Sequence, residues 1–529
     1  MASILLEERL SMKTNNQILV GRQILDVVTS AMYNNPLMIY REYIQNAVDS
    51  IDQVLASGCQ GTYSSQVKIS IEGRTRAVVI EDNGVGVPAE SAGKVLMSLG
   101  LSSKENGEFR GFRGIGRLGG IAYCDRLFFE TRALAEDIIT EVVWDRLELD
   151  RLSENGEQIS LEDAMRAVAT LSQRAACNED PENFFRVKME NVHCFHSDQV
   201  MSVGAVRDYL AQVAPVPFAD SFTQGNDVDK FLSSVPGFRA YEIWVNGKKI
   251  FRPYKDTIDF SENRSDLIEK IQKFEIYGVG NETIAKGWFA NLQYLGSLPM
   301  NDSMRGIRVR QGNIEIGGEY FLADCFAERR FATWQVGEIH VYASALKANA
   351  RRDGFEETPN YERFLEFITR LGSHLSKECR KASKNRNNYA MVLNSLNRVR
   401  NGLQDSSLYI DEEHHFGARL IYLEELSATK NYIEKYNLSK DLLSDATELE
   451  RKINQSEGKA NYLVEMINGQ KFSNKSGKQA FVDFVKNCVK NKGNNNAVDK
   501  VLLESLSDYF KQSLGCEKIN GFTINSDGI

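Results

Sequence analysis

The sequence predicts an α/β protein of several domains, and three observations support this fold class. A stripe of apolar residues at helical spacing follows a start signal at Asn34-Asn35-Pro36. Short runs rich in Val and Ile end in glycine turns, first within residues 77–88 and again within residues 241–317, where Asn246-Gly247 and Gln311-Gly312-Asn313 predict hairpin turns. Beyond about residue 375 the chain is poor in proline and its apolar residues recur at helical spacings, which favours helices, although this region is also rich in Asn, Lys, Glu and Ser. With 529 residues, the chain has room for three domains.

Composition and charge exclude several classes of protein. No apolar run approaches the ~18 to 20 residues of a membrane span, and the N-terminus MASILLEERLSMK lacks a signal-peptide pattern. The eight cysteines are scattered without a CxxC pair, so we expect reduced thiols in a cytoplasmic protein with no membrane partner. A zinc site at residues 193–196 would lack a second pair of ligands. The net charge of −8 argues against a nucleic-acid coat but leaves room for a local basic track.

The helix predicted after Pro36 has two faces. Glu42 and Asn46 lie one turn apart on a polar face, and an ordinary amphipathic helix would also place polar residues there. The same pair suits a nucleotide hydrolase, because an amide oxygen can complete the coordination of Mg²⁺ and a carboxylate can polarise a water. The core-facing stripe consists of Tyr40, Ile44, Ala47, Ile51 and Leu55.

Two glycine-containing segments follow this helix. Residues 77–80 form a β-rich run that ends in the turn Asp82-Asn83-Gly84-Val85-Gly86-Val87-Pro88, although Asp-Asn-Gly alone is a common hairpin turn. Gly111-Phe112-Arg113-Gly114-Ile115-Gly116 then precedes the apolar residues 121–129. Backbone N–H groups of such a loop can cradle phosphates at a helix start. The spacing fits neither a Rossmann fingerprint nor a P-loop. Basic residues surround this loop: Lys104, Arg110, Arg113 and Arg117.

In this order and spacing, the three segments resemble the GHKL ATPase superfamily of gyrase, HSP90-type chaperones, histidine kinases and MutL. The stretch LGLSSKENGEFRGFRGIGRLGG combines the MutL and chaperone patterns. Any lid that closes over the nucleotide should be short, because only a few residues separate Lys104 from Gly111. The resemblance implies a Bergerat-type α/β sandwich that binds ATP and Mg²⁺ and hydrolyses ATP. It makes Glu42 the general base, Asn46 the Mg²⁺ ligand and Asp82 the carboxylate that reads adenine. The other implied nucleotide contacts are Gly84, Gly86, Lys104, Gly111, Arg113, Gly114, Ile115 and Gly116.

A second resemblance lies in the middle of the chain. The segment VGEIHVYASALKANARRDGFEE, residues 336–357, resembles the catalytic loop of the chaperone middle domain, with Asn349-Ala350-Arg351-Arg352-Asp353 as its N-x-x-R-[DE] element. It implies a ribosomal-S5-like transducer domain in which Arg352 contacts the γ-phosphate, with Arg351 and Lys347 as alternates. A cation there would stabilise charge that develops during phosphoryl transfer. The alternative is a surface basic cluster that caps a helix.

We therefore expect a candidate N-terminal strap (1–20), an ATP-binding domain (21–215), a transducer domain (216–375) and a helical C-terminal region (376–529). The Lys/Arg-rich residues 377–386 are expected to end the connecting helix. Apolar residues in the strap and in the C-terminal helices favour a homodimer, although they could also close a monomeric bundle.

Two functional classes stay open. The first is an ATP-gated, chaperone-like conformational clamp with a protein client or effector. The second is a DNA-engaging clamp of the MutL or MORC type, acting in bacterial stress or phage defence with a separate effector, so DNA is an optional partner. A histidine kinase is disfavoured, because no His-bearing dimerisation helix precedes the ATPase segments. The sequence also lacks the cleavage domain of a topoisomerase and the metal-binding tail of a mismatch-repair endonuclease.

Overall fold

The structure, a computed structural model, describes residues 35–57, 63–97, 116–154, 161–194, 197–349, 352–404 and 412–455. The chain divides into two compact units, Met1–Cys379 and Arg380–Ile529, and the boundary falls inside helix α9 (Pro359–Gln404). None of the helices in the described ranges is long and apolar enough to cross a membrane.

The first unit begins with a mixed sheet of eight strands in the order β5-β4-β3-β6-β2-β1-β7-β8. All neighbours are antiparallel except β1 and β7, which are parallel. This sheet and its helices confirm the predicted α/β class. The strands are β1 (Gln66–Glu72), β2 (Ala77–Asp82), β3 (Arg126–Arg132), β4 (Ile138–Asp145), β5 (Ala169–Ala175), β6 (Phe184–Glu190), β7 (Glu242–Val245) and β8 (Lys248–Lys249).

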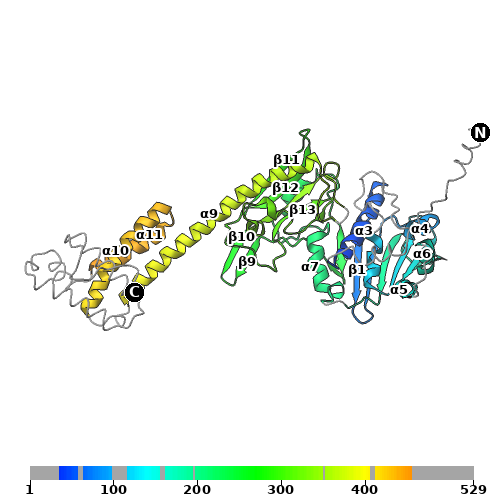
Figure 1. The fold of residues 1–529 in the computed structure, drawn as a ribbon, viewed down its shortest axis with the longest axis horizontal. Helices are drawn as coiled ribbons and strands as arrows, with labels where there is room; N and C mark the ends of the chain where they lie inside the picture. The colour runs from blue at the N-terminus through cyan, green and yellow to red at the C-terminus, as the bar shows by residue number, and fades with distance from the viewer. Residues whose placement is uncertain are drawn as a thin grey trace, which may run out of the picture. The chain divides into compact units, whose positions relative to one another are not determined.

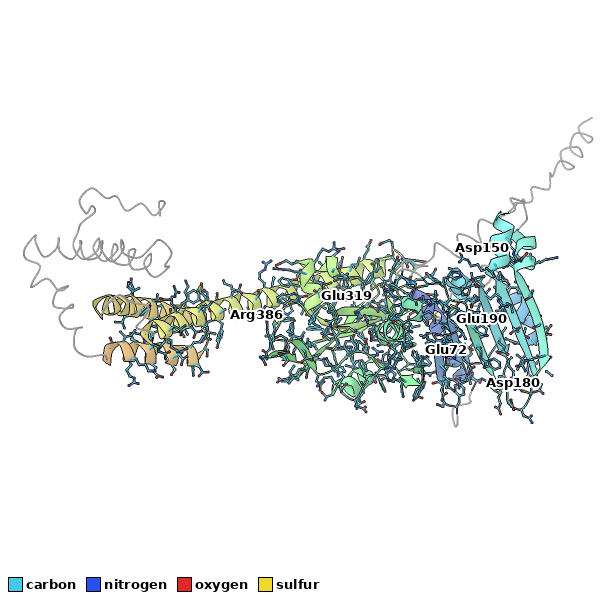
Figure 2. All side chains as sticks on the ribbon, turned by 90° about the horizontal axis from the view of Figure 1, so that it is seen from below. Glu72, Asp150, Asp180, Glu190, Glu319 and Arg386 are labelled. Carbon is cyan, nitrogen blue, oxygen red and sulfur yellow. The ribbon has the colours of Figure 1, made fainter. Side chains whose placement is uncertain are left out.

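Helices cover one face of this sheet, and the other face carries charges. Helix α3 (Met38–Ala56) lies against the sheet (Figure 1) and shares its apolar core with α7 (Val203–Val213). On the open face, Arg186 pairs across strands with Glu81 and Glu130, and Glu190 (Figure 2) pairs with Arg126. The alternation of buried and accessible residues along β1 and β2 follows from this one-sided burial. The smaller helices are α4 (Ala89–Leu96), α5 (Arg146–Glu154), α6 (Leu161–Val168), η1 (Gly116–Tyr123) and η2 (Gln199–Met201).

Strands β7 and β8 return to the first sheet after α8 (Gly225–Leu232), so residues beyond the predicted boundary at 215 belong to that sheet. Their hairpin turn is the predicted Asn246-Gly247, with φ angles of 45° and 74°. Asp52 of α3 holds the chain segment that leads into β7, because its Oδ1 accepts hydrogen bonds from Tyr241 Oη (2.5 Å) and Arg239 Nη1 (2.9 Å).

The second sheet has five strands in the order β11-β12-β15-β13-β14, with β13 and β15 parallel. The predicted turn at Gly312-Asn313 joins β13 to β14, with φ angles of 55° and 65°. The first half of α9 packs Phe364 and Ile368 into the core of this sheet. The strands are β11 (Ile271–Tyr277), β12 (Thr283–Ala290), β13 (Gly306–Gln311), β14 (Ile314–Ile316) and β15 (Val336–Val341). A hairpin of β9 (Thr257–Ser261) and β10 (Arg264–Leu267) and the short helices η3 (Ala323–Cys325) and η4 (Arg329–Trp334) complete this part.

The second unit contains the rest of α9 with α10 (Glu412–Tyr436) and α11 (Lys440–Gln455). The prediction that the Lys/Arg-rich residues end the connecting helix was wrong, since Arg386 lies along α9, which continues to Gln404 (Figure 2). The helix continues because its apolar stripe persists and no proline follows Pro359 within it. Leu426 of α10 is buried against this stripe, as expected for a bundle closed within one chain.

Candidate active site

Helix α3 is buried around most of its circumference, and its accessible stripe holds two predicted site residues. Glu42, Asn46 and Ser50 recur at four-residue spacing and stay partly accessible, whereas the flanking residues are buried. The helix begins at Met38, after Asn35 Oδ1 accepts a hydrogen bond from Leu37 N (2.9 Å). Solvent therefore reaches α3 along this stripe.

A buried arginine accompanies Glu42. Arg41 is 4% exposed, and its Nη2 lies 3.1 Å from Glu42 Oε1. The two side chains also act on Tyr209 of α7: burial raises the pKa of Tyr209, the charge of Arg41 opposes that shift, and Glu315 of β14 and Glu42 add to it. Tyr209 of α7 thus lies near the charges of Arg41 and Glu42 of α3 and of Glu315 of the second sheet.

The turn after β2 is held against α3 by its glycines. Asp82 is 4% exposed, and its Oδ1 accepts a hydrogen bond from Gly84 N (2.9 Å). A Cβ on Gly84 would lie 2.1 Å from Ser50 Oγ. Gly86 has a φ of 69°, and a Cβ there would lie 2.2 Å from the carbonyl oxygen of Arg132. Both positions therefore require glycine, the first for the approach to α3 and the second for its backbone conformation as well.

Residues distant in the sequence support this turn. Tyr63 Oη donates to the Asn83 carbonyl (2.7 Å), and Asn183 Nδ2 donates to the Gly84 carbonyl (2.6 Å). Burial raises the pKa of Tyr63, and the negative charge of Asp82 raises it further. Neither Tyr63 nor Asn183 was predicted, because nothing in the local pattern distinguishes them. Only the pairing of β2 with β6 brings Asn183 to the turn.

The order along α3 separates two ends of the candidate site. Val85 N donates to the Ser50 carbonyl (3.4 Å), so the Asp82 turn contacts α3 at Ser50. Ser50 follows Glu42 by eight residues, which is about 12 Å along a helix axis. That separation is enough to hold a nucleobase at the Ser50 end of the stripe and a terminal phosphate at the Glu42 end.

The glycine-rich motif is described only from Gly116 onward, where η1 begins. The predicted contacts Lys104, Gly111, Arg113, Gly114 and Ile115 lie outside the described residues. Helix η1 packs on α3 through Tyr43, whose Oη donates to the Arg117 carbonyl (3.0 Å). Burial lowers the pKa of Arg117 to about 10. The start of η1 therefore brings the backbone of Arg117, whose guanidinium is largely desolvated, to the turn of α3 that carries Glu42.

Arg352 lies in the loop after β15, with its backbone in the left-handed region at a φ of 55°. Its carbonyl accepts a hydrogen bond from Gly317 N (2.9 Å), and its N donates to the Asn349 carbonyl (3.2 Å). A left-handed arginine is strained, and such strain persists only where the surroundings impose it. The alternate Lys347 pairs with Glu356 at 3.3 Å, and Arg351 lies outside the described residues. The structure thus brings the predicted residues of α3 and the Asp82 turn together, whereas Arg352 is held by the second sheet.

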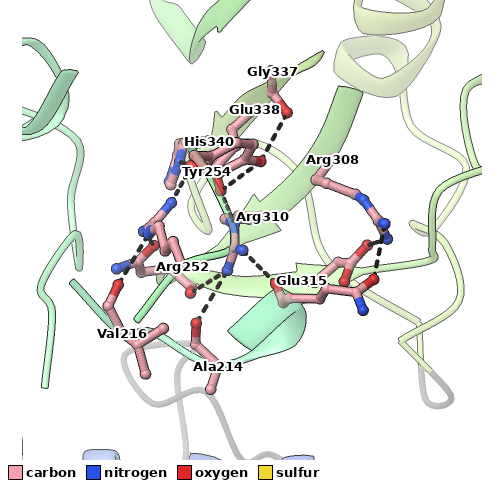
Figure 3. A network of polar contacts seen from close by, with 12 residues as sticks. Ala214, Val216, Arg252, Tyr254, Arg308, Arg310, Glu315, Gly337, Glu338 and His340 are labelled. Atoms are coloured by element: carbon pink, nitrogen blue, oxygen red, sulfur yellow. Dashed lines mark hydrogen bonds and ion pairs between the residues drawn. The ribbon is translucent and has the colours of Figure 1, made fainter. Parts of the chain in front are cut away.

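A fully buried polar cluster joins the second sheet to the chain that follows α7 (Figure 3). Glu338 of β15 accepts hydrogen bonds from Arg252, Arg310 (2.7 Å), His340 Nε2 (3.0 Å) and Tyr254 Oη (3.2 Å). Burial alone would raise the pKa of Glu338, but the charges of the two arginines and the hydrogen bond from His340 hold it well below its ordinary value. Burial lowers the pKa of His340 to about 4, so its imidazole is neutral at pH 7.

The same arginines reach the segment after α7. Arg310 Nη1 donates to the Ala214 carbonyl (3.3 Å), and Arg252 Nε donates to the Val216 carbonyl (3.0 Å). Arg308 of β13 adds a hydrogen bond to Gln212 Oε1 (2.9 Å). The end of α7 is therefore fixed to the second sheet by charged side chains, whereas Tyr209, further back in α7, lies near Arg41 and Glu42.

Comparison with known proteins assigns the first domain. Residues 39–175 match a family model described as histidine kinase-, DNA gyrase B- and HSP90-like ATPase. Similar curated proteins are named chaperone protein HtpG. The one from Acinetobacter baylyi is 28% identical over 128 residues (21% of this chain, 20% of the relative). The one from Polaromonas naphthalenivorans is 23% identical over 197 residues (34% and 30%), and the one from Geobacter sulfurreducens is 27% identical over 143 residues (23% and 22%).

The chain thus covers between 20% and 30% of the length of these relatives. The family match spans α3, the Asp82 turn, η1 and the strands through β5, which are the elements that build the candidate site. Residues 39–175 therefore belong to the GHKL family of ATPase domains, and in this region the chain resembles the HSP90-like chaperones.

Proposed function

We propose that the protein is an Mg²⁺-dependent ATPase that works as an ATP-gated, chaperone-like conformational clamp. One observation carries this proposal: Glu42 and Asn46 occupy the accessible stripe of a helix that is buried around most of its circumference, and the same stripe leads to the Asp82 turn at Ser50. A hydrolase needs this combination of a carboxylate, a metal ligand and a base-reading carboxylate around one ligand.

The roles of the residues follow from their surroundings. Glu42 orients a water and takes its proton, and the buried guanidinium of Arg41 lies 3.1 Å from its carboxylate. Asp82 accepts a hydrogen bond from the exocyclic amine of adenine, since its carboxylate is buried and oriented by Gly84. Asn46 would hold Mg²⁺ through its amide oxygen, and the bound ion would neutralise charge on the phosphates.

Arg352 supplies the cation from the second sheet in this proposal. Its strained backbone and its anchoring to Gly317 support Arg352 in this role, with Lys347 as an alternate. Arg351 remains an alternate. The proposal treats the second sheet as a transducer domain, and α7 with the Glu338 cluster as its connection to the ATPase domain.

The clamp would work as a homodimer in the cytoplasm, with a protein client or effector. The similarity to proteins named chaperones and the net charge of −8 favour this role over DNA binding. One observation favours a DNA-engaging clamp as the second candidate: the basic side chains Lys377, Arg380, Lys381 and Lys384 of α9 are exposed. Salt-dependent DNA binding that strengthens with a non-hydrolysable ATP analogue would support the second candidate.

The test of the ATPase separates binding from turnover. Glu42→Ala should lower phosphate release by about 10² or more, with ATP affinity within a few-fold of wild type, because the base acts on water. Asp82→Asn should lose ATP binding, since its amide presents a donor to the amine of adenine. Glu72→Ala on β1 (Figure 2) is the control and should change neither quantity. Equal loss of ATP binding in the two site variants would refute the division of roles, and a wild-type protein that binds no ATP would refute the function.

A further inference from the structure

We propose that Tyr43 is a positioning residue that ties the end of the glycine-rich phosphate loop to the catalytic turn of α3. The proposal rests on the ATPase function above and adds a residue that the nucleotide motif does not include. Tyr43 follows Glu42 directly and is 3% exposed. Its side chain therefore leaves α3 on the buried side, while Glu42 faces the accessible stripe.

The hydroxyl of Tyr43 makes two hydrogen bonds to the backbone of η1. It donates to the carbonyl of Arg117 (3.0 Å) and accepts from the N–H of Gly120 (3.0 Å). These two backbone groups are three residues apart, which is the spacing that closes a turn of 3₁₀-helix. One side chain of α3 thus binds both ends of the first turn after Gly116.

The packing around Gly120 leaves no room for a side chain. A Cβ there would lie 2.2 Å from Tyr43 Oη, 3.1 Å from Met189 Sδ and 3.2 Å from Leu127 Cδ1. The Sγ of Cys124 also donates to the Gly120 carbonyl (3.3 Å). The close approach of η1 to α3 therefore depends on glycine at position 120 and on the hydroxyl at position 43 together.

This contact has a consequence for catalysis. The loop that would hold the phosphates ends at Gly116, and its next turn is bound to the residue beside Glu42. A displacement of η1 would shift the phosphates relative to Glu42 and Asn46, and a misplacement of about 1 Å can lower a rate by ~10²-fold. The adenine end should be unaffected, because the Asp82 turn contacts α3 through Ser50.

The alternative is that Tyr43 is an ordinary core tyrosine that only stabilises the fold, and Tyr40 provides a matched control. Tyr40 lies on the same helix, is fully buried, and donates a single hydrogen bond to the Val200 carbonyl (2.7 Å) in η2. Tyr40→Phe and Tyr43→Phe each remove one buried hydroxyl. If the hydroxyls serve stability alone, both variants should melt earlier and keep the wild-type kcat.

We expect Tyr43→Phe to lower kcat for ATP by about tenfold or more, with the Kd for ADP within about threefold of wild type. Tyr40→Phe should keep kcat within about twofold. Hydrogen exchange of residues 116–123 should be faster in Tyr43→Phe than in Tyr40→Phe at equal temperature below melting. A kcat for Tyr43→Phe within about twofold of wild type, or equal to that of Tyr40→Phe, would overturn the proposal.

A second pair of variants tests the contact itself. Gly120→Ala should lower kcat, because its methyl group displaces the Tyr43 hydroxyl. The double variant Tyr43→Phe/Gly120→Ala should exceed Gly120→Ala in kcat, since the clashing oxygen is gone, and strictly additive losses would contradict the contact. If Tyr43→Phe does not fold, Gly120→Ala against Tyr40→Phe decides the question. A wild-type protein without ATPase activity would refute the proposed function, whereas the hydrogen exchange comparison tests the Tyr43 contact independently of turnover.

Discussion

Removal of the Glu338 charge should unfold the first unit at a lower urea concentration. Glu338 is fully buried beside Arg252 and Arg310, whose side chains are each 1% exposed. Glu338→Gln keeps the shape of the side chain but leaves both guanidinium groups without their buried counter-charge. It also points an amide donor at groups that are donors themselves.

The expected loss in the free energy of unfolding follows from the burial of three charged side chains, Glu338, Arg252 and Arg310. Removing one partner of a buried ion pair typically costs about 3–5 kcal/mol, because the remaining charge stays desolvated. With a urea slope of about 2–3 kcal/mol per molar, the unfolding midpoint should fall by about 1–2.5 M. The matched control is Asp137→Asn. The carboxylate of Asp137 is 95% exposed and lies 2.8 Å from Arg132. That exposed pair should contribute less than about 1 kcal/mol.

Tryptophan fluorescence during urea unfolding measures this effect. Trp288 is fully buried and packs edge-on against Tyr254, with ring centroids 5.1 Å apart, so its emission reports on the region around Glu338. A midpoint for Glu338→Gln equal to that of Asp137→Asn would show that the cluster does not need its negative charge. The proposed connection between α7 and the second sheet would then rest on apolar packing.

Three further predictions concern catalysis, pH and assembly. Arg352→Ala should lower phosphate release by about 10² or more at unchanged ATP affinity, with Arg352→Lys in between, and a wild-type rate for Arg352→Ala would contradict its role. The pKa of His340 is about 4 in the folded state, against an ordinary 6.5. As the pH falls, the unfolded chain therefore takes up this proton at a higher pH than the folded chain does. The free energy of unfolding should therefore drop by up to about 3 kcal/mol from pH 6.5 to 4, and His340→Gln should flatten that slope; equal slopes would contradict it. Glu42→Ala should be a homodimer that compacts with an ATP analogue, and light scattering that shows a monomer at micromolar concentration, with and without nucleotide, would refute the dimer.

Local sequence patterns were sufficient for the elements whose structure depends on nearby residues. The helix at Met38–Ala56 follows from its apolar spacing, and its polar stripe follows from the same periodicity. The turns at Asn246-Gly247 and Gly312-Asn313 require positive φ angles, which Gly and Asn tolerate, so these residues mark hairpins wherever they separate strands. The end of strand β2 at the glycine-containing Asp82 turn was predictable for the same reason.

Contacts between distant segments were decided only by the tertiary structure. Tyr43 reads in the sequence as one more helical residue, and Tyr63 and Asn183 carry no local signal, yet each binds a site segment more than 15 residues away. The parallel pairing of β7 with β1 joins residues about 175 positions apart, so the limits of the first sheet could not be read from a change in composition.

The sequence by itself determined which backbone conformations α3 and the glycine turns can adopt, because propensity and periodicity act over a few neighbouring residues. The structure decided which side chains lose contact with water. Glu338 and His340 occupy an ordinary β-rich run in the sequence, and their altered pKa values arise only after β15 is covered on both faces and two arginines from other segments converge on it. Desolvation and charge pairing are properties of the packed fold, so no local pattern can specify them.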